Sequence, residues 1–188
     1  MKVLFLDNDG VICLSNNWGS RDNKLKKFKF KNPNVKLDVK KLPVEFRFDN
    51  FDLKAVKVLN EIIEKTDCEI VVSSDWKLHA SLEELGDYYI SKGISKKPIA
   101  ITPKMEEFDP ETNNLFMWKG WLERKRITEI KKFLEENKEI THWVAVDDLN
   151  MSNEFHRDLG LPNFVLTPKM TQGIKQSGIK EKILKFLL

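Results

Sequence analysis

Short apolar runs alternate along the chain with longer stretches in which apolar residues recur every three or four positions. A short apolar run that ends in a polar turn is typical of a strand buried on both faces, and the wider spacing is typical of an amphipathic helix. This alternation predicts an α/β fold, a Rossmann-like parallel sheet of about five strands with helices on both faces. The runs occupy residues 3–6, 70–72, 98–102, 143–146 and 164–166.

Helices are expected in the intervals between these runs. Asp52 is a suitable N-cap for a helix that continues to Thr66 with apolar residues at helical spacing. Ser81 and Glu84 have the spacing of a capping box, so another helix should begin there. Further helices are expected near residues 127–134, 151–159 and 179–187.

The segment between the first strand and the first long helix has a different pattern. Phe28 and Phe30 alternate with lysines, and a similar alternation of apolar and polar residues follows at residues 44–49. A period of two is typical of half-buried strands, so the pattern predicts two or more antiparallel strands. We therefore expect one domain over residues 1–188, with a small basic β flap or cap at about 13–50 and a modest insertion at about 77–120.

The charges of the chain are unevenly distributed, although the formal net charge is only +3. Residues 21–47 contain ten Lys or Arg and three Asp or Glu, whereas the rest of the chain contains 22 basic and 26 acidic residues. Like charges at this density repel one another and resist packing, so the basic stretch should protrude into solvent. It is a candidate contact surface for polyanions; the alternative is a solvated hairpin that is basic only for solubility.

The composition, with 41% hydrophobic residues, is that of a folded globular protein. The longest apolar runs have four residues, far fewer than the roughly 18 that a membrane-spanning helix needs. The first apolar run stops at Asp7 and is too short for a secretory signal, so a cytoplasmic location is expected. Cys13 and Cys68 lack CxxC spacing, which favours reduced thiols packed in the interior.

Three of the expected strands end in residues with reactive side chains. In open parallel sheets, ligands bind at the carboxyl ends of the strands, so these residues should lie close together. Four carboxylates at one edge repel one another unless a cation lies among them, and an all-oxygen set suits magnesium better than zinc. A hard cation, a carboxylate and hydroxyl donors together favour a phosphate ester as substrate. The residues are Asp7 and Asp9, Ser73 and Ser74, and Asp147 and Asp148.

The order of these residues along the chain resembles the motifs of haloacid dehalogenase-like (HAD-like) phosphatases. The segment from Val3 to Val11, with its two aspartates, is similar to the first motif of that family. Val71-Val72-Ser73 is similar to the second motif, and Val144-Ala145-Val146-Asp147-Asp148 is similar to the fourth. More narrowly, Ser73-Ser74-Asp75-Trp76 and the helix that contains Arg126 resemble a small-cap branch found in RNA-repair proteins.

The third motif of HAD-like phosphatases is a lone basic residue, and several residues compete for it here. Arg126 is the first choice because it begins the expected helix before the fourth-motif strand. Lys125, Arg124 and Lys119 are the alternatives.

The resemblance implies a role for each matched residue. Asp7 would be the nucleophile that forms an aspartyl-phosphate, and Asp9 would be the general acid and then the general base. Ser73 would donate hydrogen bonds to the phosphoryl oxygens, and Arg126 would neutralise the charge that develops there. Ser74, Asn8 and Lys125 are expected to contact the substrate.

The resemblance also implies a magnesium ion as cofactor. Its ligands would be the Asp7 carboxylate, the Asp9 backbone carbonyl and an acid of the Asp147-Asp148 pair. Alignment places the direct ligand at Asp148 and leaves Asp147 as a supporting or further ligand. The expected function is a phosphomonoesterase that acts on a nucleic-acid end, such as a 3′-phosphate. The alternatives are a phosphatase of small molecules such as nucleotides and a catalytically idle nucleic-acid-binding module.

Overall fold

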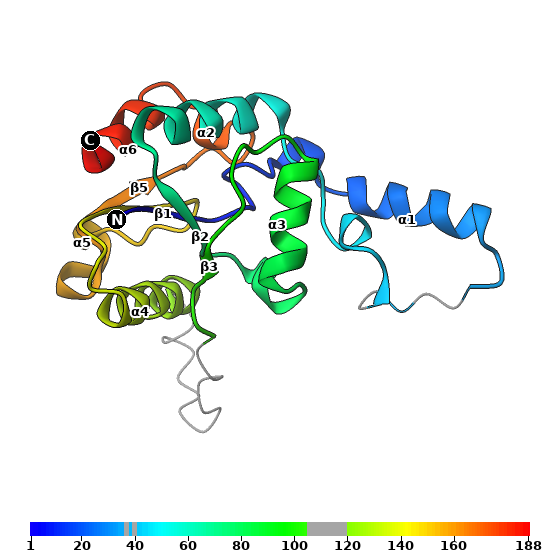
Figure 1. The fold of residues 1–188 in the computed structure, drawn as a ribbon, viewed down its shortest axis with the longest axis horizontal. Coiled ribbons are helices and arrows are strands. Elements are labelled where there is room, and N and C mark those ends of the chain that lie inside the picture. The colour runs from blue at the N-terminus through cyan, green and yellow to red at the C-terminus, as the bar shows by residue number, and fades with distance from the viewer. Residues whose placement is uncertain (36–37, 39–40, 105–119) are drawn as a thin grey trace.

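The computed structural model describes residues 1–35, 38, 41–104 and 120–188. Within these residues, the chain forms a parallel sheet of five strands in the order β3-β2-β1-β4-β5 (Figure 1). This sheet confirms the predicted Rossmann-like architecture and places β1 between β2 and β4. The strands are β1 (Lys2–Leu6), β2 (Glu69–Val72), β3 (Ala100–Ile101), β4 (His142–Asp147) and β5 (Phe164–Leu166).

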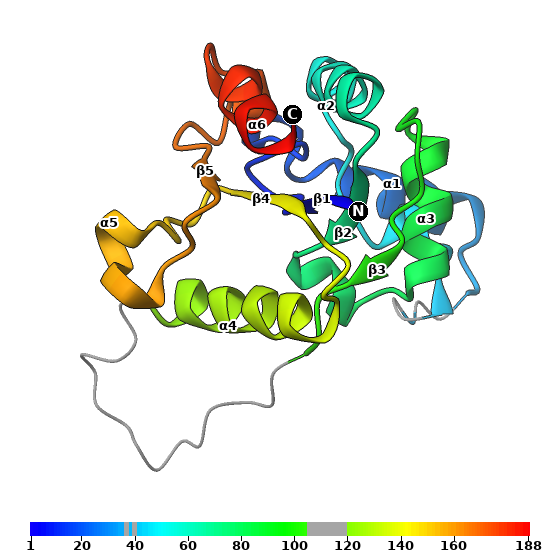
Figure 2. The ribbon, with the colours of Figure 1, turned by 60° about the vertical axis from the view of Figure 1, so that its left-hand side comes forward.

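Helices cover both faces of the sheet, as the sequence predicts. Figure 2 shows α2 (Leu53–Thr66) and α6 (Ile179–Leu187) on one side of the sheet and α4 (Trp121–Glu136) on the other. Two further helices are α3 (Leu82–Ser91) and α5 (Asn153–His156). Among the described residues, no helix combines the length and the apolar character needed to cross a membrane.

The two faces of the sheet belong to separate hydrophobic clusters because alternate residues of a strand point to opposite faces. Leu4 and Leu6 of β1 are buried in the cluster that includes α2 and α6. Val3 and Phe5 are buried in the cluster that includes the inner face of α4. This alternation decides toward which helix a side chain at the end of each strand points.

The predicted helix caps are confirmed. The Asp52 side chain accepts hydrogen bonds from the backbone N–H groups of Lys54 and Ala55, both at 2.9 Å, at the start of α2. Ser81 and Glu84 form the reciprocal capping box that begins α3. Such a cap supplies partners for backbone N–H groups that the helix itself leaves without one.

The prediction of antiparallel strands in the basic segment, and so of a β flap, is wrong. Residues Ser20–Lys31 form helix α1, which projects away from the sheet (Figure 1). Lys and Leu have high helix propensity, and Phe28 alone of the two alternating phenylalanines packs on a ring, that of Phe46, with centroids 5.0 Å apart. Phe30 is 88% exposed, so the period of two in this segment does not mark a buried face.

Helix α1 is attached to the rest of the protein along one side. The Lys24 ammonium group donates a hydrogen bond to the Phe48 carbonyl at 2.7 Å, and the Ser20 hydroxyl donates one to Asp49 at 3.1 Å. Lys24 and Phe28 are four residues apart, so they lie on the same side of the helix. The other sides of α1 face solvent, and none of its residues is buried.

Candidate active site

The register of the sheet brings three predicted site residues together at the carboxyl ends of neighbouring strands. Leu6 pairs with Val72 on one side and with Val146 on the other, so Asp7 lies next to Ser73 and Asp147. Backbone hydrogen bonds continue this register, since Asp7 N–H donates to the Val146 carbonyl at 3.1 Å and Ser73 N–H donates to the Leu6 carbonyl at 2.9 Å. Asp7 is in phase with Val3 and Phe5, so it belongs to the face that α4 covers.

Arg126 lies at the centre of this group. One of its guanidinium nitrogens is 2.9 Å from Asp7 Oδ1 and 2.8 Å from Asp147 Oδ2, and the other is 3.5 Å from Asp75 Oδ1. The Arg126 side chain is only 8% exposed because it shares the inner face of α4 with Ile130 and Phe133. The structure therefore places Arg126 between the first-motif and fourth-motif carboxylates, which is the position expected for the third-motif cation.

The competing basic residues occupy other positions. The Lys125 ammonium group lies 5.3 Å from the centre of the Trp121 ring, and Arg124 is exposed. Lys119 lies outside the described residues. None of the interactions described for Lys125 or Arg124 involves the carboxylate group, so the expected contact between Lys125 and substrate stays a prediction.

A third carboxylate, that of Asp148, completes a cluster that could hold a metal ion. Asp7, Asp147 and Asp148 each offer a carboxylate oxygen, and these atoms lie within 4.8 Å of one another. Asp148 folds over Gly10, where a β-carbon would lie 2.3 Å from Asp148 Oδ2. Gly10 also has φ of +72°, a backbone conformation that favours glycine. The turn after Asp9 therefore admits Asp148 only because residue 10 has no side chain.

The electrostatics of the cluster are those of a cation site. Burial raises the pKa of Asp7 and of Asp147 above their ordinary values, although Arg126 opposes the shift in both. Burial and the neighbouring Asp147 raise the pKa of Asp148 to about 6. One guanidinium group therefore faces several carboxylates, and the excess negative charge and the all-oxygen donor set fit Mg²⁺.

The two fourth-motif acids differ in how their oxygens are used. Asp147 is almost fully buried, its Oδ2 accepts from Arg126, and its Oδ1 accepts from the Leu149 backbone N–H at 2.8 Å. Asp148 is partly exposed and takes part in neither contact. This difference is consistent with Asp148 as the direct metal ligand and Asp147 as the residue that orients Arg126, an assignment that stays a proposal.

The remaining polar residues at the site differ in which of their side-chain atoms have a hydrogen-bond partner. Ser73 Oγ and Asn8 Nδ2 are buried and have no hydrogen-bond partner within the described part of the chain. Ser74 Oγ accepts from the Trp76 backbone N–H at 3.5 Å, and Asn8 Oδ1 accepts from the Tyr89 hydroxyl at 2.6 Å. The Ser73 hydroxyl and the Asn8 amide nitrogen are thus donors that could reach a substrate oxygen, while the side-chain oxygens of Ser74 and Asn8 already serve the local structure.

Sequence reasoning missed two interactions around the site. Lys77 is 2% exposed, forms an ion pair with Glu129 of α4 and donates to Thr102 Oγ1 at 2.8 Å. The indole N–H of Trp76 donates to Asp9 Oδ2 at 2.8 Å. Both residues lie within three positions of Ser74, and Trp76 belongs to the Ser73-Ser74-Asp75-Trp76 segment that resembles the RNA-repair branch, but neither signal indicates which residue they contact.

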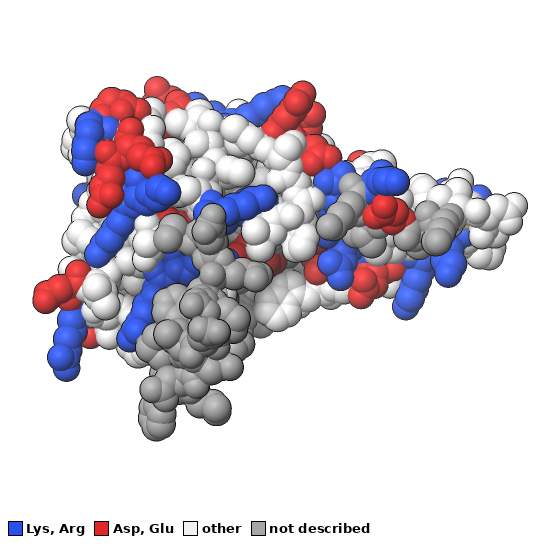
Figure 3. All heavy atoms as spheres, turned by 90° about the horizontal axis from the view of Figure 1, so that it is seen from below, with Lys and Arg blue, Asp and Glu red and all other residues white. Residues whose placement is uncertain are grey.

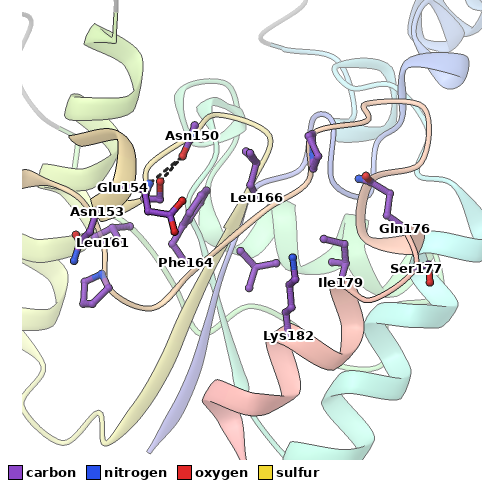
Figure 4. Close-up of a pocket in the computed structure, with 14 residues that line it drawn as sticks. Asn150, Asn153, Glu154, Leu161, Phe164, Leu166, Gln176, Ser177, Ile179 and Lys182 are labelled. Carbon is purple, nitrogen blue, oxygen red and sulfur yellow. Dashed lines mark hydrogen bonds between the residues drawn. The ribbon is translucent and has the colours of Figure 1, made fainter. Parts of the chain in front are cut away.

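A separate groove of about 650 Å³ lies beside β5 (Figure 4). Its lining includes Asn150 and Glu154 on one side and Gln176 and Lys182 on the other. None of the carboxylates of the cluster lines it. The candidate carboxylate cluster therefore lies at the ends of the central strands and not in this groove.

The doubly covered parallel sheet, with carboxylates at the ends of β1 and β4 and a guanidinium group between them, defines the HAD-like class of proteins. Residues 3–177 match the family model described as the HAD domain in Swiss Army Knife RNA repair proteins, and the chain belongs to this family. The match confirms the resemblance to the small-cap branch found in RNA-repair proteins. No curated protein and no solved structure matches the chain.

Proposed function

We propose that this protein is a magnesium-dependent phosphomonoesterase that removes a phosphate from a nucleic-acid end. The observation that carries the proposal is the position of the Asp7 carboxylate, which lies at a strand end 2.9 Å from Arg126 and in one cluster with Asp147 and Asp148, next to Ser73 of the neighbouring strand. A carboxylate nucleophile, a cation, hydroxyl and acid groups are the components that phosphoryl transfer through a covalent intermediate requires.

The reaction would proceed in two steps. In the first, an Asp7 oxygen forms a bond to phosphorus, the bond from phosphorus to the ester oxygen breaks, and Asp9 gives its proton to that oxygen. In the second, Asp9 takes a proton from water, the water oxygen bonds to phosphorus, and the bond to Asp7 breaks. Inorganic phosphate leaves, and both aspartates return to their starting state.

The other residues would stabilise the charge on the transferring group. Ser73 would donate a hydrogen bond from its hydroxyl to a phosphoryl oxygen, and Arg126 would hold Asp7 in position and offset negative charge. Magnesium, held by Asp7 and Asp148, would lower the repulsion between the nucleophile and the phosphate.

Two observations favour a polymer over a small metabolite. The family is named for RNA repair proteins. Helix α1 also carries exposed lysines along a projection from the body, where Figure 3 shows several basic side chains. Lysines spaced along an exposed helix suit the repeated phosphates of a nucleic-acid backbone better than a single phosphate. The four exposed lysines are Lys26, Lys27, Lys29 and Lys31.

A phosphatase panel tests the proposal. Phosphate release would be measured for an RNA oligonucleotide with a 3′-phosphate, the same oligonucleotide with a 5′-phosphate, a mononucleotide and an aryl phosphate, each with magnesium and with EDTA. We expect magnesium-dependent turnover, highest kcat/KM on an oligonucleotide end, and loss of at least about a thousandfold in Asp7→Asn, because an amide is a poor nucleophile.

The panel also separates the alternatives. A higher kcat/KM for the mononucleotide would favour a small-molecule phosphatase. Binding of the oligonucleotide without phosphate release from any substrate would favour a catalytically idle binding module. The cytoplasmic location expected from the sequence stays a prediction, which fractionation of cells would check.

A further inference from the structure

The carboxylate of Asp9 has one well-defined partner, the indole N–H of Trp76 at 2.8 Å from Oδ2. Asp9 is an exposed residue, and an exposed aspartate side chain otherwise moves among several rotamers. Its remaining side-chain hydrogen bond is to Cys13, whose thiol is a weak donor. The orientation of the Asp9 carboxylate therefore depends chiefly on Trp76.

Trp76 is itself held rigidly. Its ring is 5% exposed and lies between the rings of Phe48, at 4.1 Å and 6°, and Phe51, at 5.3 Å and 11°. The Tyr88 ring of α3 meets its edge, with centroids 5.9 Å apart. A tryptophan fixed in an aromatic cluster has one polar atom, and that N–H needs a partner when the ring is buried. Here the partner is Asp9.

Phe48 and Phe51 belong to the insertion between β1 and α2, so this insertion reaches the catalytic end of the sheet. The Phe48 carbonyl also accepts the hydrogen bond from Lys24 of α1. A continuous set of contacts thus leads from α1 through Phe48 and Trp76 to Asp9.

We propose that Trp76 is a positioning residue, which orients the Asp9 carboxylate toward the leaving oxygen of the substrate and is itself held by the aromatic cluster of the insertion. The inference rests on the proposed function, because it assigns Trp76 a part in the acid step of that reaction. A carboxyl group that protonates a leaving oxygen must present one of its oxygens to it, and a fixed hydrogen bond to the other selects that orientation.

Trp76→Phe tests the inference because it keeps an aromatic ring in the stack and removes the N–H. The measured quantity is kcat/KM for an aryl and for an alkyl phosphate, which reports the step up to formation of the aspartyl-phosphate. An aryl oxygen leaves without protonation, whereas an alkyl oxygen needs the acid. We expect the ratio of aryl to alkyl kcat/KM to rise about tenfold or more.

Two further variants make the test specific. In an Asp9→Asn background, Trp76→Phe should change neither rate, since Trp76 acts through Asp9. Tyr88→Phe is the matched control, because Tyr88 packs on the same indole and its hydroxyl donates to the Asp49 carbonyl. Tyr88→Phe should leave the ratio unchanged. An unchanged ratio in Trp76→Phe, or an equal loss on both substrates, would overturn the positioning role.

The hydrogen bond has a readout that does not depend on turnover. The chain contains five tryptophans, and the indole signal that disappears from the ¹H–¹⁵N spectrum in Trp76→Phe identifies Trp76. Asp9→Ala should shift that signal, and a signal that stays in place would overturn the inference. If the wild-type protein turned over none of the phosphate esters, that result would instead reject the proposed function. It would also remove the catalytic role of the hydrogen bond between Trp76 and Asp9.

Discussion

The carboxylate site and helix α1 both concentrate charge, but they hold it in opposite ways. In the site, the side chains of Arg126, Asp7 and Asp147 are 8%, 4% and 1% exposed, and the guanidinium group lies within hydrogen-bond distance of both carboxylates. Helix α1 has no buried residue, and within the described residues Lys26, Lys27, Lys29 and Lys31 form no salt bridge. The charges of the carboxylate site are buried and paired with one another, whereas those of α1 are spread along the helix and solvated.

The difference has a physical consequence. Removing a charge from water costs free energy, so buried charges persist where a partner or a ligand compensates them. Exposed charges stay in water and avoid that cost, and an ion pair between them contributes little free energy. They attract polyanions over about a Debye length. The first arrangement suits a small ion and a phosphoryl group in fixed positions, and the second suits a flexible chain of phosphates.

A change in metal affinity is expected inside the site, at Asp148. Asp148→Asn should raise the magnesium concentration for half-maximal activity at least about tenfold, because it removes a charged ligand. Asp147→Asn should raise that concentration less and lower kcat, since Asp147 holds Arg126. Magnesium titrations of phosphatase activity for the two variants provide the comparison. Equal shifts in the two titrations would reject Asp148 as the preferred ligand.

A buried pair behind the site measures the cost of burying charge. Lys77→Met removes the ammonium group that faces Glu129, and the Lys77 side chain is 1% exposed. Because the change leaves a buried carboxylate without this partner, the free energy of unfolding should fall by about 3–5 kcal/mol. Lys97→Met is the matched control, because the Lys97–Asp87 pair is exposed to solvent and should contribute far less to the free energy of unfolding than the buried pair. Urea unfolding measures both, and similar losses would contradict the contrast between buried and exposed charge.

The charges of α1 should affect nucleic-acid binding and not chemistry. The variant changes Lys26, Lys27, Lys29 and Lys31 to Ser. The slope of the logarithm of the oligonucleotide binding constant against the logarithm of salt concentration should become less negative by roughly 0.7 for each phosphate contact that is lost on a single strand. Hydrolysis of an aryl phosphate should change little. Lys24 is left in place because it anchors α1 to the Phe48 carbonyl.

A second set of four exposed lysines serves as the control for the α1 variant. Lys54, Lys57 and Lys65 lie on α2, and Lys185 lies on α6. Their change to Ser removes the same charge and should leave the salt slope as it is. Equal loss of aryl phosphate hydrolysis and of oligonucleotide turnover in the α1 variant would identify α1 as a folding element or a lid. Unchanged aryl phosphate hydrolysis and unchanged oligonucleotide turnover would show that α1 is only a solvated surface helix.

The smallest effect is expected at a charge outside both regions. Partial burial raises the pKa of Asp52. The backbone N–H groups of the α2 cap and Lys175 lower this pKa by more than burial raises it, so the pKa of Asp52 lies below its ordinary value. The native state therefore binds fewer protons than the unfolded state, and this contribution to stability is lost as the pH falls. Asp52→Asn keeps an N-cap and removes the charge.

The free energy of unfolding of Asp52→Asn should be lower than that of the wild type by less than about 1 kcal/mol at pH 7. The difference should shrink as the pH falls from about 4 through the lowered native-state pKa, below which the carboxyl group is protonated in both states. Thermal unfolding of the wild type and of Asp52→Asn across this pH range measures whether the difference in stability shrinks or grows as the pH falls. A difference that grows with acidity would contradict the assignment.

Much of the sheet and of the site could be predicted because both depend on local pattern. A residue two positions after a buried strand residue points to the same face, so Asp7 follows Phe5, Ser73 follows Val71, and Asp147 follows Ala145. Parallel strands end at one edge, which brings these side chains together without further information. The caps of α2 and α3 are also local, since each needs only a side chain and the next few backbone N–H groups.

Helix α1 was not predictable in this way. The alternation of Phe28 and Phe30 has the period of a strand, but a strand needs a partner, and the helix forms its own backbone hydrogen bonds. The packing of Phe28 on Phe46 and the hydrogen bond from Lys24 to Phe48 join residues about 20 positions apart, for which the intervening sequence has no marker.

The sequence by itself determined the alternation of strands and helices, the strand ends that bear the reactive groups and the order of the HAD-like motifs. Only the tertiary structure decided which basic residue reaches the carboxylates, because Arg124, Lys125 and Arg126 are neighbours in sequence and the docking of α4 selects one side of the helix. It also decided that Trp76 meets Asp9 and that Lys77 meets Glu129, since each pair joins residues more than 50 positions apart. Local pattern sets which face a residue belongs to, and packing of the elements sets which residue it meets.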